Sequence, residues 1–129
     1  MTQARLLAVS TLLFASVVPA FGKTTGDDVL DSCQTAIQAY DSGGGLHFAY
    51  GWCTGWVAAA TALTKLHNES AGFTEKKPSL LQFCAPDPDI PVIQAVRVVV
   101  KYLKEHPEQL HEDGMGLTIA ALKDSFPCK

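Results

Sequence analysis

The sequence predicts an all-α domain: a small disulfide-stabilised bundle of four principal helices that follows a cleaved signal peptide. Three observations support this prediction. Apolar residues recur at the three- and four-residue spacing of helices, glycine and proline separate these stretches, and four cysteines follow an amino-terminal apolar run. At 129 residues the chain has room for one domain.

The amino terminus is typical of a secretory signal peptide. Arg5 provides a basic start, residues 6–18 form an apolar run, and Val18-Pro19-Ala20 places small residues where signal peptidase cuts. The alternative, a retained membrane anchor, is disfavoured because the run is too short for a comfortable span. We expect cleavage after Ala20, with Gly22 as the second choice. Residues 1–20 are then the signal peptide, and residues 21–129 are one domain.

The charge of the mature chain excludes two classes of partner. Residues 1–20 contain one base and no acid, so the remaining nine bases and 13 acids give a net charge of −4. A mildly acidic chain without a basic run is not expected to bind nucleic acid or an anionic membrane. No second apolar stretch is long enough to span a bilayer, so we expect the mature chain to be soluble.

The first helix is expected over residues 26–40. Asp27 and Asp28 near its start suit the positive end of the helix dipole, and residues 41–45 (Asp-Ser-Gly-Gly-Gly) form a stop and a turn. One face of this helix is apolar: Val29, Leu30, Cys33, Ile37 and Tyr40.

The second helix is expected over residues 46–67 and is the longest. We interpret its two tryptophans as core residues, with a binding platform as the alternative. Gly51 and Gly55 form a smooth patch that another helix could approach closely. The expected core face is Phe48, Trp52, Trp56, Ala59, Ala60, Leu63 and Leu66.

Two more helices follow a polar loop over residues 68–79 and a return to the core at residues 80–83. In the link over residues 85–91, Asp89 is the expected N-cap, and Pro91 the expected first-turn residue, of a helix that ends at Glu105. The β-branched residues of this helix make a buried strand over residues 96–102 the alternative. The last helix is expected over residues 116–126, with Leu117, Ala120, Ala121 and Leu122 inward. The preceding helix turns Val92, Val96, Val99, Val100 and Leu103 inward.

The cysteines predict two disulfides and no metal site. In an exported chain an even set of cysteines forms bridges worth roughly 2–4 kcal/mol each, and no two of these lie at the two-to-four spacing of zinc knuckles. Cys33 and Cys53 lie ten residues before and after Gly43, so an antiparallel hairpin would place them at the same level. We therefore prefer Cys33–Cys53 with Cys84–Cys128. The alternative joins Cys53 to Cys84 and Cys33 to Cys128.

No stretch of the sequence predicts a catalytic centre or a cofactor. An even set of cysteines leaves no obvious thiolate for a Cys–His hydrolase. His106 and His111 are five residues apart across a proline, so they do not share a helical face as a zinc protease requires. The triple glycine lacks the lysine and the preceding strand of a phosphate loop. By elimination, the sequence predicts a binding protein.

Four stretches resemble, in order, the Rap/Tai family of immunity proteins. Residues 53–56 (Cys-Thr-Gly-Trp) resemble its C-x-G-aromatic signature, and residues 84–86 its Cys-Ile-Pro element, with alanine in place of isoleucine. Residues 99–108 are similar to its V-x-x-Y-L-x-x-H-P-E segment. Residues 121–128 resemble its closing Ala-Leu and Trp-Pro-Cys, with phenylalanine in place of tryptophan, and Cys33 takes the place of the cysteine in its first helix.

The resemblance implies a periplasmic, disulfide-bonded helical protein of a kind that often forms a homodimer. It also implies an immunity role: relatives bind peptidoglycan amidases delivered by type VI secretion systems and occlude their active sites. The segment over residues 68–79 is our candidate for the occluding surface, with an ordinary loop as the alternative and residues 87–90 as the second surface. The candidate partner-binding residues are Asn68, Glu69, Phe73, Glu75, Lys76 and Lys77.

Two rival functions come from other classes of protein. A periplasmic stress chaperone, in the style of the small helical acid-stress proteins, would need an apolar surface that acid releases, and four histidines and acidic loops could supply the switch. An enzyme or enzyme subunit with an unrecognised site would be indicated by a free reactive cysteine. Another periplasmic binding role is the third alternative.

Overall fold

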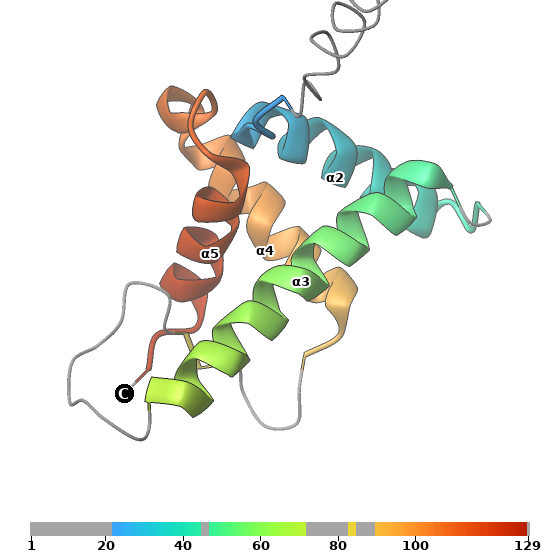
Figure 1. Cartoon of the computed structure of the whole chain (residues 1–129). Coiled ribbons are helices and arrows are strands. Elements are labelled where there is room, and N and C mark those ends of the chain that lie inside the picture. Colours follow the sequence, from blue (N-terminus) through green and yellow to red (C-terminus); the bar gives the residue numbers. More distant parts are fainter. Residues whose placement is uncertain (1–21, 45–46, 72–82, 85–89, 129) are drawn as a thin grey trace, which may run out of the picture.

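The computed structural model describes residues 22–44, 47–71, 83–84 and 90–128, and within these ranges its regular elements are helices, apart from an isolated antiparallel bridge between Thr25 and Asp113 (Figure 1). The predicted all-α bundle of four principal helices is confirmed, and a short 3₁₀-helix accompanies it. The predicted signal peptide, residues 1–20, lies outside the described residues. The helices are α2 (Gly26–Asp41), α3 (Phe48–Ala71), α4 (Val92–Glu105), η1 (Pro107–Gln109) and α5 (Gly114–Ser125).

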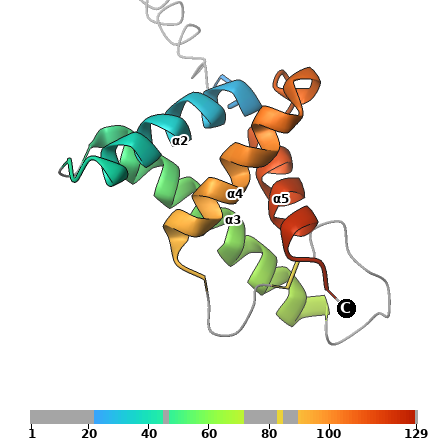
Figure 2. The ribbon, with the colours of Figure 1, turned by 180° about the vertical axis from the view of Figure 1, so that it is seen from behind.

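The core lies where α4 meets the other three α-helices. Helix α4 lies behind α3 in Figure 1, and the view from behind places it in front (Figure 2). It contacts α2, α3 and α5, and an ion pair between Arg97 and Asp41 ties it to the end of α2. The largest fully buried side chains come from all four helices: Val29, Val57, Thr64, Val96, Val99, Leu103, Thr118 and Leu122.

A capping box starts α2. The Asp28 carboxylate accepts hydrogen bonds of 2.8 Å from the backbone N–H and the hydroxyl of Thr25, and the Asp28 backbone N–H donates to the Thr25 hydroxyl at 3.4 Å. These bonds lower the pKa of Asp28 below its ordinary value, because they stabilise the charged carboxylate. The sequence analysis noted Asp28 only for its charge and did not assign Thr25 as the cap.

This capping box should make the stability of the domain depend on pH. The pKa of Asp28 is lower in the folded chain than in the unfolded one, so its contribution is present above pH about 4 and is lost as the pH falls through the folded pKa. We expect Thr25→Ala to cost about 0.5–2 kcal/mol at neutral pH and to reduce the loss on acidification. Urea denaturation at a series of pH values measures both effects.

Thr35→Ala is the matched control, because the Thr35 hydroxyl donates to the Asp31 carbonyl within α2 and caps nothing. It should leave the pH dependence unchanged. Equal pH dependence in wild type and Thr25→Ala would show that the capping box is not its source.

The starts of α2 and α5 cross at two glycines. The Gly26 N–H donates to the Glu112 carbonyl at 3.1 Å, and the Gly114 N–H donates to the Thr24 carbonyl at 2.9 Å. A Cβ on Gly114 would come within 2.8 Å of the Thr25 carbonyl oxygen, and one on Gly26 within 2.5 Å of the Leu117 side chain. Only glycine permits this close approach. The last helix begins at Gly114, directly after its N-cap Asp113, and so two residues before the expected start.

Helix α4 is helical throughout the stretch for which a strand was the alternative, so the strand interpretation is wrong. The residues that face the core are Ala95, Val96, Val99, Val100 and Leu103, whereas the expected core residue Val92 is 38% exposed. Pro91 occupies the N-cap position, one residue before the expected first turn, and Asp89 lies outside the described residues.

The expected core face of α3 is the main correction to the sequence analysis. The buried residues of α3 are Cys53, Val57, Ala60 and Thr64, whereas Phe48, Leu63 and Leu66 are 85%, 51% and 63% exposed. Residues 48–64 include no charged side chain, so the sequence offers little polar contrast to mark the outer face. The buried bridge from Cys53 to α2 instead orients the helix.

The two tryptophans of α3 are half-buried at the edge of the core. Their rings stack with centroids 5.2 Å apart, and the Trp56 indole N–H donates to the Thr118 hydroxyl on α5 at 3.0 Å. This agrees with the interpretation of Trp52 and Trp56 as packing residues. On α2, Tyr40 is 50% exposed rather than buried, and its ring stacks on Tyr50 of α3.

The preferred disulfide pairing is confirmed and the alternative pairing is wrong. Cys33 bonds to Cys53 with their Cα atoms 5.1 Å apart, and Cys84 bonds to Cys128 with their Cα atoms 4.9 Å apart. The first bridge is buried and ties α2 to α3. The second joins the carboxy-terminal end to the residue that follows Phe83.

Candidate partner-binding surface

No metal site forms among the residues that the structure describes: they contain no group of three or more His, Cys, Asp or Glu side chains able to hold an ion. His106 occupies the C-cap position of α4, and its Nδ1 lies 3.3 Å from a Glu108 carboxylate oxygen. The pKa of Glu108 is lowered by a hydrogen bond with its own backbone and, to a smaller extent, by His106. All four cysteines are in disulfides.

The candidate partner-binding residues begin inside α3. The sequence analysis started the loop at Asn68, but the backbone stays helical through Ala71, and therefore Asn68 and Glu69 belong to the last turns of α3. The expected loop start is wrong because Asn-Glu-Ser-Ala contains no residue that must end a helix, and the first glycine is Gly72. Phe73, Glu75, Lys76 and Lys77 lie outside the described residues.

Both ends of this candidate segment join the folded domain. Helix α3 leads into it, and the chain beyond it returns at Phe83, whose side chain is 4% exposed. The next residue, Cys84, donates its backbone N–H to the Phe126 carbonyl at 2.9 Å and is bonded to Cys128. A buried aromatic ring and a disulfide thus hold the point at which the chain re-enters the domain.

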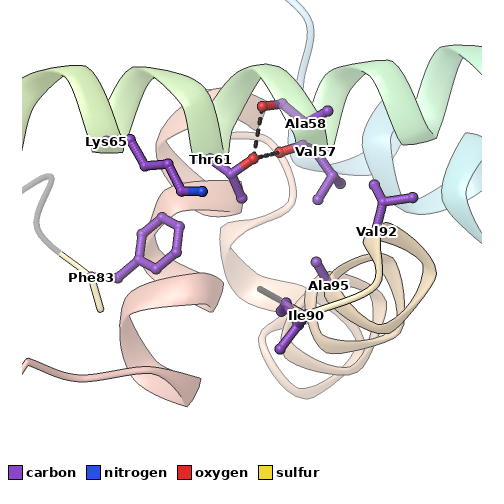
Figure 3. Close-up of a pocket in the computed structure, with 8 residues that line it drawn as sticks. All are labelled: Val57, Ala58, Thr61, Lys65, Phe83, Ile90, Val92 and Ala95. Carbon is purple, nitrogen blue, oxygen red and sulfur yellow. Dashed lines mark hydrogen bonds between the residues drawn. The ribbon is translucent and has the colours of Figure 1, made fainter. Parts of the chain in front are cut away.

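An apolar pocket of about 150 Å³ lies between α3 and the start of α4 (Figure 3). The Thr61 hydroxyl donates to the carbonyls of Val57 and Ala58, at 3.2 and 2.7 Å, so its polar atom bonds to its own helix. Because the pocket depends on how α3 packs on α4, no sequence pattern indicated it. Its lining residues are Val57, Ala58, Thr61, Lys65, Phe83, Ile90, Val92 and Ala95.

The outer face of α3 is a second surface that the sequence analysis missed. We call it the apolar stripe, and all its members are exposed. The sequence analysis noted the glycines of this face as a smooth patch but assigned Phe48, Ala59, Leu63 and Leu66 to the core, although the uncharged run of residues 48–64 was a usable signal. The stripe consists of Phe48, Gly51, Gly55, Ala59, Ala62, Leu63 and Leu66.

None of the described helices is both long enough and apolar enough to cross a membrane. The described residues present two features suited to contacts with another protein: the α3–α4 pocket and the apolar stripe.

Comparison with models of known protein families assigns the chain to one of these families. A family model described as Rap1a immunity proteins matches residues 25–128, from the cap of α2 through the last cysteine. The chain belongs to the Rap1a immunity protein family. No curated protein and no solved structure gave a significant match.

Membership of the Rap1a family suggests an immunity or inhibitor role, exercised by binding a protein partner rather than by catalysis. The matched region includes both disulfides and all the described helices. The two bridges and the family are consistent with an exported, periplasmic protein.

Proposed function

We propose that this Rap1a family member is a periplasmic immunity protein that binds a peptidoglycan amidase delivered by type VI secretion and blocks its active site. The family match over residues 25–128 is the observation that supports this proposal. The two disulfides support export, because such bridges persist in an oxidising compartment. The Rap/Tai resemblance supports the amidase as the effector, and it also implies a homodimer.

The proposed mechanism is occlusion by the segment over residues 68–79. A segment that enters an enzyme groove must keep its position, and this one leaves the end of α3 and re-enters the domain at the buried Phe83 and the disulfide-bonded Cys84. Phe73 would be the apolar anchor, with Glu69, Glu75, Lys76 and Lys77 around it. The α3–α4 pocket adjoins Phe83 and Ile90, so contacts could extend to the second candidate surface, residues 87–90.

Protection of bacteria from a periplasmic amidase tests the proposal. A type VI peptidoglycan amidase that the chain binds would be directed to the periplasm of a host bacterium, with the full chain co-expressed from its own amino terminus. Wild type should prevent lysis. Phe73→Ala should weaken binding of the amidase at least about tenfold, and Lys76→Glu with Lys77→Glu should weaken it further, because these substitutions remove an anchor and reverse two rim charges.

Lys101→Glu with Lys104→Glu is the matched control, because it reverses two exposed charges on α4. The control should protect as wild type does. Lysis in the presence of correctly exported wild type would contradict immunity, whereas full protection by the segment variants would contradict only occlusion by residues 68–79. The chaperone rival instead requires that the chain suppress aggregation of a client protein at low pH, and we expect no suppression.

A further inference from the structure

The two disulfides differ in their accessibility to solvent. Cys33 and Cys53 are each 0% exposed and form what we call the buried bridge, between α2 and α3. Cys84 and Cys128 are both exposed and form the exposed bridge, which lies outside the helices and beyond the end of α5 at Ser125. A disulfide is cleaved when a thiolate reaches one of its sulfur atoms, so accessibility determines which bridge can react in the folded chain.

The exposed bridge takes no part in the buried core of the described residues. That core is a cluster of buried apolar side chains from α2, α3, α4 and α5 together with Phe83, and it includes both cysteines of the buried bridge. The helices pack on one another through residues other than Cys84 and Cys128. We expect the domain to stay folded when the exposed bridge alone is opened.

The exposed bridge instead holds the point at which the chain re-enters the domain. Cys84 directly follows the buried Phe83, and its backbone N–H donates to the Phe126 carbonyl at 2.9 Å. The disulfide adds a covalent link from this point to Cys128, whose Cα atom lies 4.9 Å from that of Cys84. The chain after α5 and the last turn of α3 lie toward the same end of the molecule in both views (Figures 1 and 2). The link is therefore placed to influence the segment that leaves α3.

We propose that the exposed bridge is a site of reversible thiol–disulfide exchange with a protein dithiol, and that its reduction weakens inhibition of the amidase. The exchange site follows from accessibility alone, because exposed disulfides are the labile ones. The effect on inhibition rests on the proposed occlusion by residues 68–79.

The exchange proceeds in two balanced steps. A thiolate of the dithiol attacks one sulfur atom of the bridge, the Cys84–Cys128 bond breaks, and the other cysteine leaves as a thiolate that takes up a proton. The second thiol of the dithiol then loses its proton, attacks the mixed disulfide and releases the remaining cysteine, which is protonated in turn. Two electrons and two protons thus pass to the bridge, and the dithiol becomes a disulfide.

Reduction removes the covalent hold on the re-entry point and leaves the buried bridge in place. A segment that fills an enzyme groove must keep its position, and a segment with a looser attachment loses more conformational freedom when it binds. We expect the chain with an open Cys84–Cys128 bridge to bind the amidase about tenfold more weakly than the oxidised chain. Reoxidation should restore binding.

Alkylation of the full chain, taken in its oxidised form from an exporting host, tests the exchange site without any effector. The chain would be incubated with excess reduced thioredoxin as the dithiol probe, quenched with iodoacetamide and mapped by mass spectrometry. Cys84 and Cys128 should be alkylated at least about a hundredfold faster than Cys33 and Cys53, because the buried bridge becomes accessible only in rare unfolded molecules. Circular dichroism should show the helices unchanged while the exposed bridge opens.

Binding of the amidase tests the effect on inhibition. Cys84→Ser with Cys128→Ser removes the exposed bridge permanently and keeps the buried one, so this variant should bind about tenfold more weakly than oxidised wild type. Addition of reduced thioredoxin should weaken binding by wild type to the same extent and leave binding by the variant unchanged. Wild type with oxidised thioredoxin is the matched control and should keep full binding.

The outcomes separate the exchange site from the proposed function. Equal alkylation rates for the two bridges, earlier opening of the buried bridge, or loss of helix when the exposed bridge opens would overturn the exchange site. Equal binding by oxidised wild type and the double serine variant would overturn the effect on inhibition. Oxidised wild type that binds no amidase would contradict the proposed function and with it this effect, while the alkylation rates would still decide the exchange site.

Discussion

Replacing Leu103 with alanine should lower the free energy of unfolding by about 2–5 kcal/mol. Leu103 is 1% exposed and lies on α4, which contacts every other α-helix, so the substitution would open a cavity in the core. A domain of this size has a total stability of about 5–15 kcal/mol, so the variant should be close to unfolding at ambient temperature. Urea denaturation measures the loss directly.

Leu63→Ala is the informative comparison for Leu103→Ala. The sequence pattern predicts that Leu63 is a core residue, whereas the structure leaves it 51% exposed. In dilute protein the substitution should cost less than about 1 kcal/mol, because little apolar surface returns to water and no cavity forms. A cost equal to that of Leu103→Ala would contradict the observed orientation of α3.

Replacing both Cys33 and Cys53 with alanine should cost about 3 kcal/mol or more. The bridge closes a loop with a sequence separation of 20, for which the chain-entropy contribution is about 3 kcal/mol, and both side chains are fully buried, so a small cavity adds to the loss. Both residues must be replaced together, since a single substitution would leave a free thiol in the core. The midpoint of urea denaturation under oxidising conditions is the measurement.

Wild type treated with a reductant provides the reference for the double cysteine variant. Reduction removes the Cys84–Cys128 bridge as well, so reduced wild type should be less stable than the oxidised variant. A double variant as stable as oxidised wild type would show that the bridge between α2 and α3 does not stabilise the fold.

The boundaries of the fold follow from local chemistry that is visible in the sequence. Glycines end α2 and precede α3, proline precedes α4 and follows it, and Asp113 caps α5 with a 2.8 Å hydrogen bond from the Gly116 N–H. The disulfide pairing was also predictable, because Cys33 and Cys53 are equidistant from the glycine turn and two helices joined by a short turn bring such positions together.

The candidate surfaces depended on contacts between residues far apart in the chain. The α3–α4 pocket brings Thr61 of α3 together with Phe83 and Ala95, and no local pattern records that packing. The apolar stripe was misassigned for a related reason: a helix that is apolar on most sides satisfies several core faces equally well. The proposal that residues 68–79 occlude an enzyme came from the sequence. The structure describes only the helical start of this segment, through Ala71, and the point beyond it where the chain re-enters the domain, at Phe83 and Cys84.

By itself, the sequence determined the helical class, the four-helix order and the resemblance to an immunity family, because spacing, turn residues and cysteine positions are local signals. It favoured one disulfide pairing but left an alternative open, and the structure decided between them. The tertiary structure alone decided which side of α3 faces the core. That choice is made by the buried Cys33–Cys53 bridge and by the packing of Val57 and Thr64, and it turns Phe48, Leu63 and Leu66 outward. Residues 48–64 of α3 carry no charge that would mark an outer face, so only the neighbouring helices could determine the orientation of α3.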